Sequence, residues 1–299
     1  MRRFEWPTVA LIAANYLVWG SLVWFHASIP WWVLLPVGAY TVALHASLQH
    51  EALHGHPTSN ATLNDALVTL APHLWLPYPR YKELHLIHHN DANLTDPARD
   101  PESYYLLPET WAALPGLKQT LYSLNNTLAG RMIMGPAISI IRFWSSEFAA
   151  IARGDAAITR AWLHFAAASA LVLVYVTIIC GMPFWQYVLL FAYPGISLAL
   201  VRSFCEHQAA EQVGHRTIIV EASPFWSLLF LFNNLHVVHH AAPALAWYKI
   251  PALYRAQRAD FIARNNGYTM HGYAEIFRRY FLKAKEPVPY PDTAWLKPR

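Results

Sequence analysis

The sequence predicts an all-α integral membrane protein, in which four transmembrane helices form two hairpins and the other segments build a helical cap on the cytoplasmic side. Its composition is the first reason: 55% of the 299 residues are hydrophobic and only 13% are charged. The mean hydropathy is positive, which is unusual for a soluble globular protein. The second reason is four apolar stretches of spanning length, and the third is a set of short histidine boxes. No repeat or linker divides the chain, so residues 1–299 are expected to form one domain.

The first two apolar stretches predict a transmembrane hairpin over residues 8–27 and 30–49. Each is close to the roughly 20 residues that cross the hydrocarbon core of a bilayer. Arg2 and Arg3 precede the first stretch, but no small-residue cleavage site follows it. A retained first helix is therefore expected, and not a removed signal peptide.

A second hairpin is predicted over residues 161–181 and 184–202, around the turn Gly181-Met182-Pro183. The segments outside the hairpins have interfacial character. Residues 72–79 contain three prolines and predict a bend, and residues 117–152 predict a membrane-surface helix broken at Gly135-Pro136. Residues 224–235 are too short to span the membrane, and the proline-rich tail from Lys283 predicts an extended chain.

The cations predict the orientation. None of the 22 Lys and Arg residues lies in the two short hairpin turns, so all of them fall on one side of the membrane. The positive-inside rule then places both termini in the cytoplasm. The net charge of +4 follows from this topology, and without a nucleic-acid-binding motif we expect no nucleic-acid partner.

Nine of the 16 histidines predict a metal centre. Spacings of three and four residues place imidazoles on one helix face, and neutral imidazole binds transition metals well. With two cysteines in the chain, the site must be rich in nitrogen ligands. Nine ligands exceed what one ion uses, which favours two adjacent ions. The predicted ligands are His50, His54, His85, His88, His89, His207, His236, His239 and His240.

The predicted topology brings these histidines to one face of the membrane. His50 and His54 follow the second span, and His207 follows the fourth. The other two boxes lie in segments that the same topology keeps cytoplasmic. No catalytic residue beyond the metal ligands is predicted.

The ordered boxes His50-Glu51-Ala52-Leu53-His54, His85-Leu86-Ile87-His88-His89 and His236-Val237-Val238-His239-His240 resemble those of the integral-membrane fatty acid desaturase and hydroxylase superfamily. The similarity covers about residues 30–250. It implies two Fe²⁺ ions held by the boxes, with His207 matching the family's additional histidine after the fourth span.

The resemblance implies O2-dependent oxidation of an unactivated C–H bond in a lipid acyl chain. Desaturation of a fatty acyl lipid or thioester ranks first, ahead of hydroxylation, carotenoid ketolation and oxidative decarboxylation. The chain has no nucleotide-binding glycine motif and no iron–sulfur cysteine cluster, so a separate ferredoxin, rubredoxin or cytochrome donor is implied. Zinc binds nitrogen ligands more tightly than Fe²⁺ and can replace iron in overproduced protein.

Several polar residues have both a functional and a structural interpretation. Lone histidines are expected to be structural; these are His26, His45, His73, His164 and His271. His56 is not among the predicted ligands, and the sequence leaves open whether it replaces one of them. Candidate partners for ligand N–H groups are Asp91, Asp96, Asp100, Glu102, Glu206 and Asn234. Candidate contacts for an anionic headgroup are Arg80, Lys82, Arg216 and Lys249.

The main alternative is a membrane zinc protease, because residues 50–54 also satisfy the HExxH pattern with Glu51 as the general base. Such an enzyme needs one further ligand, and not two further histidine boxes. A metal transporter or a haem-binding membrane protein is a third possibility. Transport sites lie near the bilayer midplane, however, whereas these histidines lie at one surface.

Overall fold

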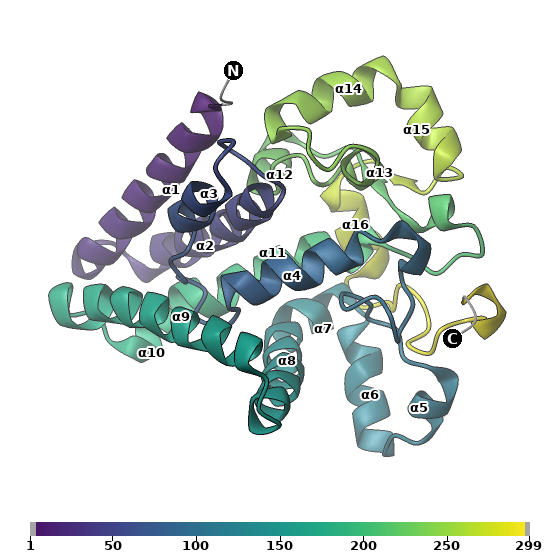
Figure 1. The fold of residues 1–299 in the computed structure, drawn as a ribbon, viewed down its shortest axis with the longest axis horizontal. Helices are drawn as coiled ribbons and strands as arrows, with labels where there is room; N and C mark the ends of the chain where they lie inside the picture. Colours follow the sequence, from purple (N-terminus) through teal and green to yellow (C-terminus); the bar gives the residue numbers. More distant parts are fainter. Residues whose placement is uncertain (1–3, 297–299) are drawn as a thin grey trace. The chain divides into compact units, whose positions relative to one another are not determined.

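The computed structural model describes residues 4–296, so Arg2 and Arg3, which the orientation argument used, lie outside the described residues. The chain divides into two compact units. The first unit comprises residues 1–82 and 136–199, and the second comprises residues 83–135 and 200–299. Both are mainly helical (Figure 1).

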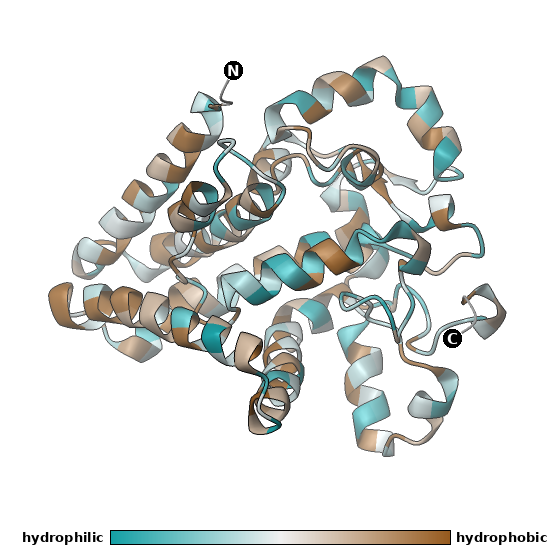
Figure 2. Cartoon of the chain, viewed as in Figure 1, coloured by the Kyte–Doolittle hydropathy of each residue, from teal (hydrophilic) through white to brown (hydrophobic). Residues whose placement is uncertain are grey.

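The first unit contains the helices of both hairpins. Its elements are α1 (Trp6–Trp24), η1 (His26–Ser28), α2 (Trp31–Leu53), α3 (Ala61–Leu67), the start of α4 (Tyr78–His88), most of α8 (Gly135–Ala152), α9 (Ala156–Leu173), the π-helical η3 (Val174–Ile179), α10 (Phe184–Tyr187), the π-helical η4 (Val188–Ala192) and the first half of α11 (Tyr193–Glu206). Hydrophobic residues dominate α1 and α9 in Figure 2.

Within residues 4–296, four helices are long and apolar enough to cross a membrane, as the sequence predicted. They run over Trp6–Trp24, Trp31–Leu53, Ala156–Ile179 and Phe184–Glu206. The predicted and observed bounds differ by up to five residues. The third helix begins earlier than expected because Asp155 caps it, accepting the backbone N–H groups of Ala157 and Ile158.

Close backbone contact joins the two hairpins inside the first unit. A Cβ atom on Gly38 of α2 would lie 2.8 Å from Phe191 of η4, and one on Gly195 of α11 would lie 2.5 Å from Val42. Only glycine permits such an approach. The surrounding core is fully buried and includes Val23, Leu34, Val176, Tyr187 and Phe191.

The second unit holds the shorter elements. Beyond the C-terminal part of α4, they are η2 (Asp91–Asn93), α5 (Pro108–Ala112), α6 (Gly116–Asn125), α7 (Leu128–Ile133), η5 (Val213–Arg216), β1 (Ile219–Val220), α12 (Pro224–Leu229), α13 (His236–Ala241), η6 (Trp247–Lys249), α14 (Ile250–Ala256), α15 (Arg258–Arg264), β2 (Thr269–Met270), α16 (Tyr273–Tyr280) and η7 (Thr293–Trp295). Strands β1 and β2 form a parallel pair that the all-α prediction did not include.

The segment over residues 117–152, predicted as a surface helix broken at Gly135-Pro136, has a break next to that position and a second break that was not predicted. It forms α6, α7 and α8, with breaks at residues 126–127 and at Met134. The Thr127 hydroxyl accepts the backbone N–H of Gly130 and starts α7 there. Gly135-Pro136 lies in the first turn of α8, where proline is tolerated. The predicted bend before the second histidine box is present, and α4 begins at Tyr78.

Candidate metal centre

The second histidine box lies at the C-terminal end of α4. His85 and His88 are 1% and 2% exposed, whereas Leu86 and Ile87 between them are about half exposed. His89 follows the helix and donates its backbone N–H to the carbonyl of His85. The i, i+3, i+4 spacing thus places all three imidazoles on the protected side of α4.

The third box forms α13, a six-residue helix that is buried on every side except at Ala241. Its Val237 and Val238 belong to an apolar cluster with Ile219 of β1 and Ile250 of α14. The backbone N–H of Val237 also donates to the carbonyl of Ile218. This packing holds the helix in place, so its histidines project from a rigid support.

His207 directly follows α11 and is held by its backbone. It forms an isolated antiparallel bridge with Thr217, flanked by hydrogen bonds from Gln208 N to Arg216 O and from Ile218 N to Glu206 O. The ammonium group of Lys285 donates to the carbonyl of His207. The imidazole is thereby fixed without the support of a helix.

Four of these histidines converge on one point in the second unit. His88, His207, His236 and His240 each offer one nitrogen, and the four nitrogens lie within 4.8 Å of one another. The Nε2 atoms of His88 and His236 are both 3.1 Å from Nε2 of His207. We call these four residues the second cluster.

A neighbouring group in the second unit comprises His85, His89 and His239. The Nε2 atom of His89 lies 3.0 Å from Nε2 of His85 and 3.0 Å from Nε2 of His239. We call these three residues the first cluster. The two boxes of the second unit therefore interleave, because each contributes ligands to both clusters.

The remaining predicted ligands belong to the first unit. His50 and His54 lie one helical turn apart at the end of α2, with ring centroids 4.9 Å apart. His50 is 4% exposed. Their spacing is the one that the sequence predicted for a shared face.

Carboxylate oxygens fix the orientation of three of the imidazoles. Nδ1 of His85 donates to Glu102 Oε1 at 2.7 Å, and Nδ1 of His88 donates to Asp100 Oδ1 at 2.8 Å. Nδ1 of His240 donates to Asp91 Oδ1 at 2.8 Å. An ionised carboxylate only accepts, so the proton sits on Nδ1 and the lone pair sits on Nε2.

The protonation energetics differ within the second cluster. Burial lowers the pKa of His207, His236 and His240, which keeps these rings neutral. Burial also disfavours the charged form of His88, but the negative charges of Glu102 and Asp100 outweigh it and raise its pKa to about 9. A metal ion would take the place of that proton.

The donor set fits a transition-metal ion. Converging imidazole lone pairs repel one another unless a cation lies between them, and nitrogen ligands suit iron, zinc and copper. Within residues 4–296, the buried Nε2 atom of His240 has no hydrogen-bond partner. A buried polar atom without a partner is costly, and a metal bond to this nitrogen would remove that cost.

Not every predicted partner residue touches a histidine. Asn234 donates to the carbonyl of Val220, and Asp96 accepts the backbone N–H of Ala98. Glu206 pairs with Arg202 at 2.8 Å, and its Oε1 atom also lies 3.7 Å from Nδ1 of His236. The sequence interpretation missed Asn233, whose Oδ1 accepts Nδ1 of His236 at 2.8 Å. Its position three residues before His236, at the turn that starts α13, is the signal that could have identified it.

His56 belongs to a separate group in the first unit. Its Nδ1 atom lies 2.9 Å from Glu5 Oε2 and 3.8 Å from Glu51 Oε1, and all three residues are buried. The ligand atoms of Glu5, Glu51 and His56 lie within 4.8 Å of one another. Glu5 was not singled out from the sequence because no motif includes it.

The five lone histidines have structural partners. His45 contacts Tyr16, His73 contacts Gln49, His26 contacts the carbonyl of Val23, His164 contacts Thr69 and His271 contacts Glu221.

Three of the four candidate headgroup cations are also engaged inside the protein. Arg80 forms a buried pair with Glu147, and Lys82 pairs with Asp65. Arg216 donates to the backbone carbonyls of Ala210 and Leu94. Lys249 is exposed.

Comparison with known proteins supports the chemistry of this donor set. The fatty acid desaturase family matches residues 26–273, which contain all three boxes and His207. No individually curated protein matches the chain. The match covers most of the chain, and the histidine clusters are those that a diiron oxidoreductase of this kind requires. The protein therefore belongs to the fatty acid desaturase family.

Proposed function

We propose that this protein is a membrane desaturase that inserts a double bond into a fatty acyl chain, using O2 and a pair of iron ions. The observation that carries the proposal is the interleaving of the two clusters, because each box of the second unit serves both. Family membership implies a lipid substrate.

The proposed ligand assignment follows the boxes. The second cluster, with four imidazoles, holds one iron. His85, His89 and His239 would contribute to the other, and the resemblance to the family implies that His50 and His54 are further ligands of the centre. Bound iron supplies the ability to activate O2 for attack on an unactivated C–H bond, which no side chain possesses.

The protein's own residues prepare that site. Asp91, Asp100, Glu102 and Asn233 hold the imidazoles in the tautomer that presents Nε2. The burial of the ligands excludes water, which protects a reactive oxidant from side reactions.

The reaction is tested by expressing the protein in iron-supplemented cells and analysing the host lipids by mass spectrometry. Desaturation predicts products two mass units lighter, and the purified protein should contain two irons per chain. A gain of 16 mass units would identify a hydroxylase instead. His207→Ala removes a proposed ligand of the second cluster and should abolish the product. The matched control is His215→Ala, which should retain the product because His215 is outside both clusters.

The substitution Glu51→Gln distinguishes a zinc protease from a desaturase. In a zinc protease this change removes the general base and abolishes peptide cleavage. In a desaturase it leaves the nine histidines intact, so lipid oxidation should persist. Peptide cleavage by the wild type that is lost in Glu51→Gln, with unchanged lipids, would contradict the proposal.

The electron donor is proposed to be a small acidic redox protein that binds near α14 and α15. Four exposed cations, which we call the basic arc, follow these helices; they are Lys249, Arg255, Arg258 and Arg264. Arg264 also lines a cavity of about 50 Å³ together with Asp91 and His240. The basic arc is thus adjacent to a ligand of the second cluster.

Charge reversal tests this surface. Arg255→Glu/Arg258→Glu should raise KM for a reduced acidic [2Fe–2S] ferredoxin roughly tenfold at low salt, because steering by opposite charge is lost. Lys118→Glu/Arg278→Glu reverses the same number of charges on other elements and should leave KM unchanged. Turnover driven by a small neutral reductant should be equal in both variants. An equal rise of KM in both would show that net charge, and not the basic arc, determines binding.

A further inference from the structure

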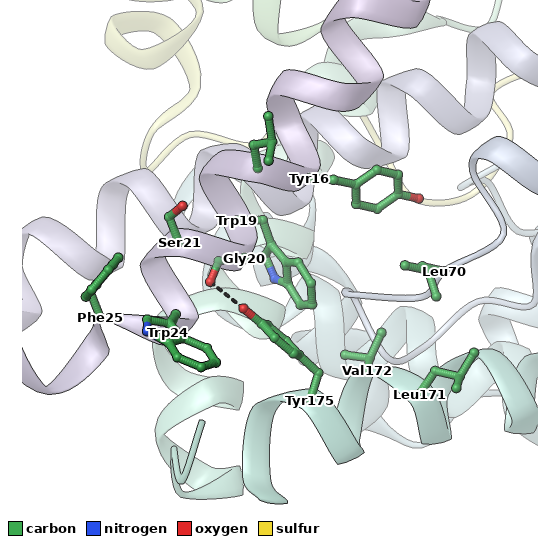
Figure 3. Close-up of a pocket in the computed structure, with 11 residues that line it drawn as sticks. Tyr16, Trp19, Gly20, Ser21, Trp24, Phe25, Leu70, Leu171, Val172 and Tyr175 are labelled. Atoms are coloured by element: carbon green, nitrogen blue, oxygen red, sulfur yellow. Dashed lines mark hydrogen bonds between the residues drawn. The ribbon is translucent and has the colours of Figure 1, made fainter. Parts of the chain in front are cut away.

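The first unit contains a large apolar groove that the metal chemistry does not use. Its volume is about 500 Å³, within the range of sites that bind small molecules. One wall is the C-terminal half of α1, and the other is formed by Leu171, Val172 and Tyr175 at the junction of α9 and η3 (Figure 3). Leu70 lies at its end in the view of Figure 3.

The groove lies in helices that can span a membrane. Both walls belong to candidate spans, and their rims face outward: Leu17 is 71% exposed and Leu171 is 64% exposed. In a bilayer, the molecules available to such a surface are lipid chains. The groove is therefore accessible from the hydrocarbon phase.

The lining suits a hydrocarbon chain and no charged ligand. Within the described residues, none of the groove's lining side chains is charged. Its two tyrosine hydroxyls are already used, since Tyr175 donates to the carbonyl of Gly20 at 2.8 Å and Tyr16 contacts His45 at 2.9 Å. A free carboxylate would find no cation here, whereas an apolar chain gains dispersion contacts with Trp19 and Trp24.

Gly20 creates the open space between the walls. A Cβ atom at this position would lie 3.5 Å from the Tyr175 hydroxyl, so the next side-chain atoms would extend into the groove. Tyr175 belongs to the π-helical segment η3, an irregularity that often marks a functional position in a helix. The absent side chain and the irregular helix together leave room for an occupant.

The groove follows α1 from Phe25, at the turn of the first hairpin, to Tyr16, and neither His50 nor His54 lines it. Its turn end is far from these two histidines, because 19 residue steps of α2, about 28 Å of helix, lead from Trp31 to His50. An occupant anchored at the turn is therefore held at the end of the hairpin away from His50 and His54. Its role is separate from that of the reacting chain.

We propose that the groove holds one acyl chain of a membrane phospholipid, bound lengthwise as a lasting component of the protein. The headgroup would lie beside the turn at residues 25–30, where Trp31 and Trp32 are 64% and 63% exposed. Exposed tryptophans are typical of the membrane interface. A headgroup that stays at this interface explains why the groove needs no charged lining. The proposal does not depend on the reaction that the metals support.

Native mass spectrometry of protein purified in mild detergent tests this site. The wild type should retain one phospholipid per chain. Gly20→Leu should lower the retained lipid roughly tenfold, because the new side chain displaces several methylene contacts. Ala14→Leu adds the same side chain to an exposed position of α1 outside the groove and should retain the lipid.

A second pair of variants tests the same site independently, in case Gly20→Leu does not fold. Leu171→Trp narrows the groove from α9, whereas Leu163→Trp changes an equally exposed leucine of α9 that does not line it. Only Leu171→Trp should lose the lipid. In nanodiscs with a diazirine-labelled phosphatidylcholine, crosslinks should concentrate in peptides carrying Trp24 and Tyr175. Uniform crosslinking over both hairpins, equal retention by all variants, or crosslinking by a labelled free fatty acid alone would overturn the proposal.

Discussion

Individual carboxylates determine which imidazole nitrogen carries the proton and which carries the lone pair. Asp100 illustrates this, because it accepts Nδ1 of His88 and also the backbone N–H groups of Thr95 and Glu102. Three donors hold one carboxylate rigidly, and the carboxylate in turn holds His88. The orientation of His88, a proposed metal ligand, thus depends on a loop twelve residues further along the chain.

We predict that Asp100→Asn lowers metal affinity at the second cluster by about 10–100-fold, the usual effect of losing a partner of a ligating histidine. Zinc titration monitored by mass spectrometry measures it. Asp96→Asn, in the same loop but bonded to the backbone of Ala98, is the control and should leave the affinity unchanged. Equal affinity of Asp100→Asn and the wild type would contradict the assigned role.

At this scale the sequence was informative about which histidines lie together and less so about their hydrogen-bond partners. Histidine spacing predicted which imidazoles share a face, because helix periodicity depends on position alone. The choice of Asn233 over Asn234 depends on the turn that starts α13, and on which side chain points inward. Periodicity does not determine that geometry.

Helices of the first unit are joined by a buried ion pair. Arg80 of α4 contacts Glu147 of α8 through two nitrogens, with distances of 2.9 Å from both Nε and Nη2. Trp162 of α9 donates to the same carboxylate at 3.2 Å. The carboxylate of Glu147 therefore joins α4, α8 and α9.

Glu147→Ala should destabilise the protein by about 3–5 kcal/mol, because it leaves Arg80 buried without its partner. The change should appear as a lower melting temperature of detergent-solubilised protein. Glu109→Ala removes an exposed carboxylate of α5 and should leave the melting temperature unchanged. A wild-type melting temperature for Glu147→Ala would mean that the pair contributes little to stability.

The existence of the long helices was predictable, whereas their ends were not. Length and hydropathy of the four spans depend on composition, which the sequence states directly. The helix start at Ala156, the breaks on either side of α7 and the pairing of β1 with β2 depend on caps and on partners distant in the chain. The sequence suggested that Arg80 contacts a lipid headgroup. Its actual partner, Glu147, lies 67 residues away in the chain, so the sequence does not reveal the pairing.

At the scale of the whole molecule, the distribution of cations predicts that both termini face the cytoplasm. In a Cys180→Ser background, a cysteine at Ala27 should react with a membrane-impermeant maleimide added to intact cells, and a cysteine at Ala284 should react only after lysis. Cys205 is 1% exposed and should not react. The reverse pattern of labelling would invert the topology and place the histidine boxes on the other side.

The division into two units also bears on the order in which the chain is synthesised. The chain passes between the units after Lys82, Gly135 and Ala199, and the second cluster draws on residues from His88 to His240. A ribosome-bound chain that ends before His236 holds only two of its four nitrogens. A metal ion can therefore be held by all four nitrogens only after about four-fifths of the protein has been made, and we expect metal loading to follow the synthesis of all four candidate spans.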